Sequence, residues 1–152
     1  MKFKIEIDPD QPEELLLRAP TITEEISRIR KGIDGILRSE GEISLRKAET
    51  EFFLPYRDIL YFETSENRVW AHTKNDCFYC ALRLNELEEL LPRTFTRGSK
   101  SNLVNTALIQ SIRRSPTGVA EVSFRGSDKK VYISRLYYHM VRDIIEETRL
   151  SK

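Results

Sequence analysis

The stretch from Phe95 to Asn105 carries the side chains best suited to chemistry, and the chemistry they suit is binding to a polyanion. Basic, hydroxyl and amide side chains alternate there between apolar residues at both ends. Lysine and arginine neutralise phosphates and contact guanine, asparagine pairs with adenine edges, and serine contacts either. We expect a projecting loop that presents Arg97, Ser99, Lys100 and Asn102. An ordinary solvated loop is the alternative.

The charge distribution points the same way. The net charge of +1 conceals a difference between residues 1–66, at −5, and residues 67–152, at +6. Between Leu90 and Ala120 there is no acidic residue, and there are five basic ones. An acid-free basic stretch suits a polyanion, because each neutralised phosphate releases counterions. A loop that only meets solvent remains the alternative.

Other chemistries find little support in the spacing of reactive residues. If residues 77–83 form a strand, Cys77 and Cys80 face opposite sides and cannot chelate one ion. His72 and His139 are not spaced as paired ligands, and no glycine-rich phosphate loop or serine-nucleophile motif occurs. We therefore predict no metal, no cofactor, no small-molecule substrate and no enzymatic activity. Two cysteines are too few for a disulfide framework, and with no apolar signal segment they favour the cytoplasm.

A small appendage is expected before residue 42. Residues 2–7 alternate strictly and predict a strand, and residues 14–18 predict a second. Thr21 and Glu24 have the spacing of a capping box before a helix. The apolar residues of that helix recur at steps of three and four: Ile22, Ile26, Ile29, Ile33, Ile36 and Leu37. Residues 1–41 are therefore predicted to form a strand-strand-helix segment that either forms a dimer or caps the next domain.

After Gly41 the pattern changes to short alternating runs separated by polar turns. Such spacing predicts a meander or barrel-like sheet, so the fold class is α+β, mainly β. Asn85 is expected to cap a short helix. Ser134 is expected to cap a last helix, whose inward residues would be Leu136, Tyr137, Met140, Val141, Ile144 and Ile145.

The ordered segments ILYFETSENRVWAHT from residue 59, LNELEELLP from 84, FTRGSKSNLVN from 95 and VYISRLYY from 131 resemble a LytTR-type DNA-binding domain. The resemblance covers about residues 42–150. The opening MKFKIEIDPD resembles the small standalone LytTR regulators. The resemblance implies an elongated, mostly antiparallel β domain with few helices, whose loops enter successive major grooves at repeated promoter sites.

Matched by position, the resemblance implies DNA contacts in three places. The turn after the strand at 59–63 carries Asn67 and Arg68, the central loop carries Arg97, Ser99 and Lys100, and the turn before the last helix carries Ser134 and Arg135. The chain departs from the family pattern at four positions: Gly98 replaces a bulkier residue, Ser99 a histidine, Asn102 an aromatic or acidic residue, and Leu136 an arginine.

The sequence thus predicts a cytoplasmic, sequence-specific regulator of transcription that binds double-stranded DNA as a homodimer. Asn67 and Lys100 are the favoured contacts to base edges, and the other cations are expected on phosphates. The resemblance also implies a small membrane protein as a regulatory partner. Two alternatives stay open: a protein-interaction module whose basic loop binds an acidic partner, and a module that binds single-stranded RNA.

Overall fold

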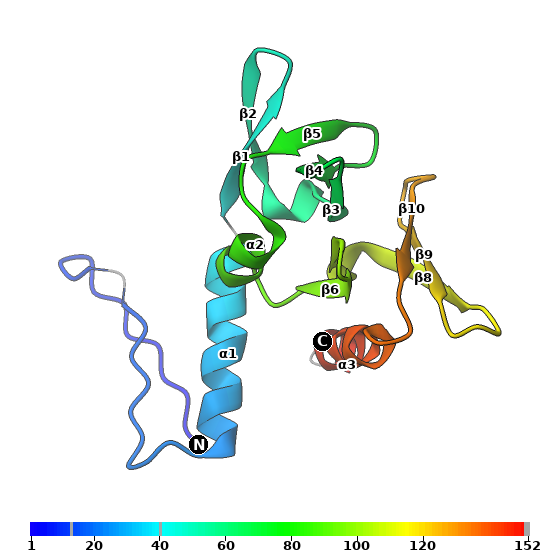
Figure 1. The fold of residues 1–152 in the computed structure, drawn as a ribbon. Helices are drawn as coiled ribbons and strands as arrows, with labels where there is room; N and C mark the ends of the chain where they lie inside the picture. The colour runs from blue at the N-terminus through cyan, green and yellow to red at the C-terminus, as the bar shows by residue number, and fades with distance from the viewer. Residues whose placement is uncertain (13, 40, 151–152) are drawn as a thin grey trace.

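A computed structural model describes residues 1–12, 14–39 and 41–150 (Figure 1). The helices are α1 (Glu24–Ser39), α2 (Leu84–Leu90) and α3 (Tyr138–Leu150), with short 3-10 turns at Tyr56–Asp58 and Thr106–Leu108. The strands are β1 (Glu42–Lys47), β2 (Thr50–Pro55), β3 (Tyr61–Ser65), β4 (Arg68–His72), β5 (Cys77–Cys80), β6 (Phe95–Ser99), β7 (Asn102–Asn105), β8 (Ile109–Arg114), β9 (Ala120–Phe124) and β10 (Lys130–Ile133).

The strands form two antiparallel sheets. Seven strands pair in the order β2-β1-β5-β4-β3-β7-β6, and three pair in the order β10-β9-β8. Neighbouring strands in the chain form hairpins, as expected from the short turns between them. However, β5 pairs with β1 and β3 pairs with β7, so the large sheet is not a simple meander. The predicted class, α+β and mainly β, is confirmed.

Alternating burial explains why these segments are strands. In β9, Ala120, Val122 and Phe124 are buried while the residues between them are half-exposed, so one face of the sheet packs inward. One core cluster packs α2 against the large sheet around Phe62, Leu87 and Leu103. The second packs α3 against the small sheet, and it includes residues of the large sheet's strands, so the two sheets share it.

The two strands predicted in the appendage are not present. Residues 2–7 and 14–18 have no strand structure, and Phe3, Ile5 and Ile7 are exposed. A strand requires a neighbour for its main-chain groups, and neither segment lies on a sheet edge. The predicted helix is present as α1, but its first turn is capped by Thr23, whose hydroxyl accepts a hydrogen bond from the Ile26 amide at 3.2 Å. The sequence favoured Thr21.

The predicted caps of the other two helices are also wrong. Asn85 lies inside α2, and the N-cap position belongs to Arg83, which makes no side-chain capping bond. Ser134 lies four residues before α3, and its carbonyl, not its hydroxyl, accepts a bond from the Tyr137 amide. The turn thus formed points Leu136 outward, where it is 78% exposed, and Met140 is also exposed. The other inward positions of α3 are as predicted, with Val141, Ile144 and Ile145 buried.

Candidate nucleic-acid interface

The turn between β3 and β4 places the first pair of predicted contact residues at one end of the large sheet. Ser65 pairs with Arg68 across a two-residue turn of Glu66 and Asn67. Both turn residues have positive φ, at 53° and 62°, the conformation that a tight hairpin needs and that asparagine tolerates. Asn67 and Arg68 are exposed, so this turn can present an amide and a guanidinium to a ligand.

The predicted central loop is a hairpin made of β6 and β7. Lys100 and Ser101 form its turn, and the register shifts between Arg97 and Ser99, which marks a bulge at Gly98. The Ser99 hydroxyl accepts a hydrogen bond from the Ser101 amide at 3.1 Å and so stiffens the turn. Lys100 is exposed at the tip. Its ammonium has no ion pair within the described ranges, which leaves it available to a phosphate or a base edge.

The prediction that Asn102 projects is wrong. Asn102 is only 6% exposed, and its amide nitrogen donates to the Tyr132 carbonyl at 2.8 Å. Its side-chain oxygen lies buried without a hydrogen-bond partner. A strand residue alternates faces, and Asn102 lies on the face of β7 that meets β10. Asn102 therefore holds the hairpin to the small sheet and does not reach outward.

Arg97 does not project freely either. Its guanidinium pairs with the Glu88 carboxylate from α2 and donates to the Lys100 carbonyl at 2.8 Å. Its side chain is only 19% exposed. Glu88 therefore fixes Arg97, and Arg97 fixes the tip that carries Lys100. The sequence contained one signal for this ion pair. Residues 90–120 contain no acid, so an arginine that packs there has to pair with an acid from another part of the chain.

The third predicted place is the turn between β10 and α3. The Ser134 amide donates to the Gly98 carbonyl at 2.7 Å, which ties this turn to the bulge in β6. Arg135 is exposed, and its aliphatic stem lies against Gly118 in the β8–β9 turn. Gly118 has φ +89°, and a Cβ there would lie 2.8 Å from Arg135 Cδ. Gly118 therefore leaves the space in which the Arg135 stem lies, a role that the sequence did not show.

Main-chain hydrogen bonds bring the three turns side by side. The Thr64 amide donates to the Ser101 carbonyl at 2.8 Å, so the Lys100 turn and the Asn67 turn lie at the same end of the large sheet. The bond between Ser134 and Gly98 joins the third turn to the same hairpin. Asn67, Arg68, Ser99, Lys100, Ser134 and Arg135 thus lie on turns of one connected framework.

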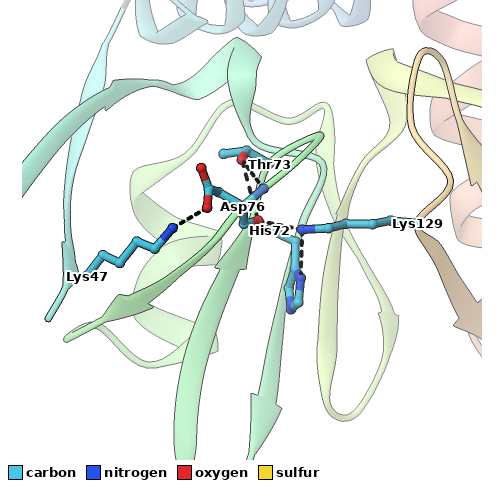
Figure 2. Close-up of polar contacts among 5 residues, drawn as sticks. All are labelled: Lys47, His72, Thr73, Asp76 and Lys129. Atoms are coloured by element: carbon cyan, nitrogen blue, oxygen red, sulfur yellow. Dashed lines mark hydrogen bonds and ion pairs between the residues drawn. The ribbon is translucent and has the colours of Figure 1, made fainter.

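A polar cluster joins the two sheets at the other end of β3 and β4 (Figure 2). Lys129, before β10, reaches across to donate to the Asp76 carbonyl and to Nδ1 of His72, the latter at 3.4 Å. On its other nitrogen, Nε2, His72 contacts the Glu63 carboxylate at 2.7 Å. With Nδ1 accepting from the ammonium, Nε2 carries the proton and donates to Glu63. A neutral imidazole thus links a cation of the small sheet to an anion of the large one.

Burial shifts the pKa values of this cluster. Desolvation lowers the pKa of His72, and Lys129 lowers it further, against the opposing effect of Glu63. Desolvation also lowers the pKa of the Lys129 ammonium and raises the pKa of Tyr61, whose ring stacks on His72, to about 12. Each shift favours the neutral form, as expected for groups withdrawn from water. The cluster is therefore a structural joint with His72 uncharged at neutral pH.

A match to a known protein family covers the part of the chain that carries the three turns. Residues 49–146 match the sequence model of the LytTr DNA-binding domain. The chain belongs to the LytTr DNA-binding domain family. The match includes all three turns and both sheets' central strands, and the family is one of DNA-binding domains and not of enzymes.

Curated relatives extend the similarity beyond the LytTr domain. Uncharacterized HTH-type transcriptional regulators of Staphylococcus aureus strains bovine RF122 / ET3-1 and NCTC 8325 / PS 47 are each 26% identical over 144 residues. Each match covers 94% of this chain and 97% of the relative, so most of residues 1–41 has a counterpart in both. In the described part of this LytTr chain, strands separate the three helices along the sequence, so no helix-turn-helix motif occurs there.

A solved LytTr DNA-binding domain from Bacillus cereus has the same fold. The two sequences are 21% identical, and the structures superpose with a TM-score of 0.64. The superposition includes 69% of this chain and 96% of the solved domain. Across the described residues, no helix combines the length and the apolar character needed to cross a bilayer. Within the same ranges, no three histidine, cysteine, aspartate or glutamate side chains form a group that could hold a metal ion.

Proposed function

We propose that this LytTr protein is a cytoplasmic regulator of transcription that recognises specific duplex DNA sequences at promoter repeats through its three connected turns. The observation that carries the proposal is the pair of main-chain bonds, Thr64 to Ser101 and Ser134 to Gly98, that holds the three turns together. A rigid framework of this kind fixes the spacing of its exposed side chains. Fixed spacing is what recognition of bases in adjacent grooves requires.

The candidate contact residues on these turns divide into two roles in this proposal. Asn67 and Lys100, at turn tips, reach base edges, because an amide and an ammonium supply the donors and acceptors that distinguish bases. Arg68 and Arg135 lie beside them and contact phosphates, with Ser99 and Ser134 as further hydroxyl donors. Arg97 and Asn102 position the hairpin from within, so their contribution is to its shape and not to direct contact.

The test compares two charge-matched variants, Lys100→Ala and Arg113→Ala. Arg113 is an exposed cation of β8 that pairs with Glu121 at 3.1 Å and belongs to none of the three turns. The binding site is first selected from random duplexes, and each variant is then titrated against that site and a scrambled duplex at two salt concentrations. Lys100→Ala is expected to cost about 1–3 kcal/mol on the selected site only and to relax preference at one base position.

Arg113→Ala is expected to lower the affinity for both duplexes by the same factor. If Arg113 contacts a phosphate, the slope of log affinity against log salt concentration becomes smaller by about one. If Lys100→Ala lowers the affinity for both duplexes equally, this turn positions the protein without recognising bases. No loss on either duplex would exclude the turn from the interface and favour the alternative, in which the basic surface binds an acidic protein.

A further inference from the structure

A pocket of about 780 Å³ lies beside the central hairpin and is lined by residues of all three described helices. The strand β6 contacts both α2 and α3, and the pocket lies where these elements meet (Figure 1). Lys31 and Asp34 of α1 line it from a third side. Sites for small molecules have volumes of about 300–1,000 Å³. The pocket is therefore large enough for a ligand of this size.

The floor of this pocket is apolar. Leu91, Phe95 and Ile144 line it, and they are only 3%, 6% and 7% exposed. Met140 lines it from one turn before Ile144 and is 48% exposed. A methionine side chain is flexible and polarizable, so it adapts to apolar groups of different shape. The floor thus combines fixed apolar side chains with one that can adjust to a ligand.

A buried hydroxyl group also lines the pocket. Thr96 is only 7% exposed, and its hydroxyl forms no hydrogen bond with any other described residue. Buried side-chain polar groups nearly always have a partner, as at Thr106, whose hydroxyl donates to the Thr94 carbonyl at 2.7 Å. The Thr96 hydroxyl therefore has a donor and an acceptor to offer to a polar group of a ligand.

The rim of the pocket is cationic. Four basic residues line it, Lys31, Arg93, Arg97 and Lys100, against two acidic ones, Asp34 and Glu88. Both arginines are already paired, Arg97 with Glu88 and Arg93 with Glu147 at 3.0 Å. Neither lysine forms an ion pair within the part of the chain that the structure describes. Two ammonium groups are therefore available at the rim of an apolar pocket.

We propose that this pocket binds a small organic anion, whose apolar body lies on the floor and whose anionic group is held by Lys31 and Lys100. A phosphate of a DNA backbone would use the two ammonium groups but not the apolar floor. A neutral apolar molecule would use the floor but neither the ammonium groups nor the Thr96 hydroxyl. Only a ligand with an apolar body and an anionic group uses every part of the pocket.

Lys100 makes such a ligand a regulator, and this step rests on the proposed function. The ammonium group that holds the anion is the one proposed to reach a base edge of DNA. It cannot serve both at once, so ligand and DNA compete, and each lowers the affinity for the other by the same factor. The organic anion is therefore an effector that releases the protein from DNA.

The first test uses two fluorescent dyes that share one aromatic body. Anilinonaphthalene sulfonate is anionic, and N-phenyl-naphthylamine is the same molecule without its sulfonate. Both become brighter when they pass from water into an apolar site. In titrations of the full chain without DNA, the sulfonate is expected to bind once per chain, at least about 10-fold more tightly than the neutral dye. Equal affinities would overturn the proposal, because exposed apolar surface elsewhere does not discriminate between them.

Two pairs of variants locate the site. Met140→Glu adds a carboxylate in the pocket and is expected to weaken binding of the sulfonate at least about 10-fold, whereas His139→Glu adds the same charge at the preceding, exposed position outside the pocket and is expected to have no effect. Lys31→Ala is expected to weaken it at least about 5-fold, and Arg30→Ala, which removes a cation that lines a different groove, to leave it unchanged. All four positions are exposed, so the fold tolerates these changes. An unchanged affinity in Met140→Glu or in Lys31→Ala would overturn the site.

The second test adds the duplex selected for DNA binding. With the sulfonate at about ten times its Kd, the wild type and His139→Glu are expected to bind this duplex about 10-fold more weakly, and Met140→Glu to be insensitive to the dye. Dye binding that leaves DNA affinity unchanged would overturn the regulatory step. Absence of duplex binding by the wild type without dye would contradict DNA recognition, while the dye titrations alone still decide whether the pocket binds an organic anion.

Discussion

Replacing Gly98 with alanine would add one methyl group at the point where the central hairpin meets the small sheet. The new Cβ would lie 2.5 Å from Oδ1 of Asn102, 3.1 Å from Val104 and 3.2 Å from Ile133. Val104 and Ile133 are completely buried, and the Asn102 amide is bonded to the Tyr132 carbonyl. None of these neighbours is the free end of a flexible side chain, so the hairpin itself has to shift.

Overpacking of this kind costs about 1–3 kcal/mol. For a chain of this length, each kcal/mol lowers the melting temperature by about 2–4 °C, so Gly98→Ala is expected to melt about 2–12 °C below the wild type. Because Ser134 is bonded to the Gly98 carbonyl, the same shift displaces the turn that carries Arg135. The variant is therefore expected to lose affinity for the selected duplex even at temperatures where it is folded.

The assay is thermal unfolding followed by circular dichroism, with Gly32→Ala as the matched control. Gly32 lies in α1, and an added Cβ there meets nothing within 4 Å. The same methyl group is expected to raise helix content, because alanine favours a helix by about 1 kcal/mol over glycine, and to leave the melting of the sheets unchanged. A Gly98→Ala protein as stable as the wild type and equal in DNA affinity would refute a rigid junction between hairpin and sheet.

Two further predictions concern buried polar groups. Desolvation holds the pKa of His72 below its ordinary value of 6.5, so the unfolded chain takes up the proton first as the pH falls. The free energy of unfolding, measured by urea titration at a series of pH values, should therefore decrease below about pH 6.5. His72→Gln should make this pH dependence less steep. An equally steep dependence in the variant would contradict a neutral His72 between Lys129 and Glu63. Asn105→Ala removes a buried amide that donates to the Ile59 carbonyl at 2.9 Å and accepts from the Ala107 amide. This variant should lower the free energy of unfolding by about 1–3 kcal/mol in the same titrations. A decrease of less than about 0.5 kcal/mol would contradict the assigned contacts.

Local patterns determined most of the elements. Alternation in segments such as Ala120–Phe124 requires only that one face of a strand be apolar, and this is a property of adjacent residues. The turn at Glu66 and Asn67 was equally visible, since polar residues between two apolar runs predict a hairpin. The four quoted segments were also sufficient to identify the family, because they span most of the domain and occur in the family's order.

The same local reasoning failed where a segment depends on a distant neighbour. Residues 2–7 alternate like a strand, yet a strand forms only where a sheet edge can pair with it. Thr21 and Asn85 have capping side chains, but the helix start depends on how the chain enters it, and this made Thr23 and Arg83 the caps. Propensity is a weak preference that tertiary packing overrides.

The candidate interface divides in the same way between sequence and tertiary structure. The sequence alone determined that residues 90–120 are basic, and that Lys100 and Asn67 lie in turns, because composition and turn residues are local properties. Only the tertiary structure decided that Asn102 faces β10, that Glu88 pairs with Arg97 and that Gly118 accommodates Arg135. Each of these contacts joins residues at least nine positions apart, and which distant side chains meet depends on strand order and register, which the hydrophobic pattern leaves undetermined.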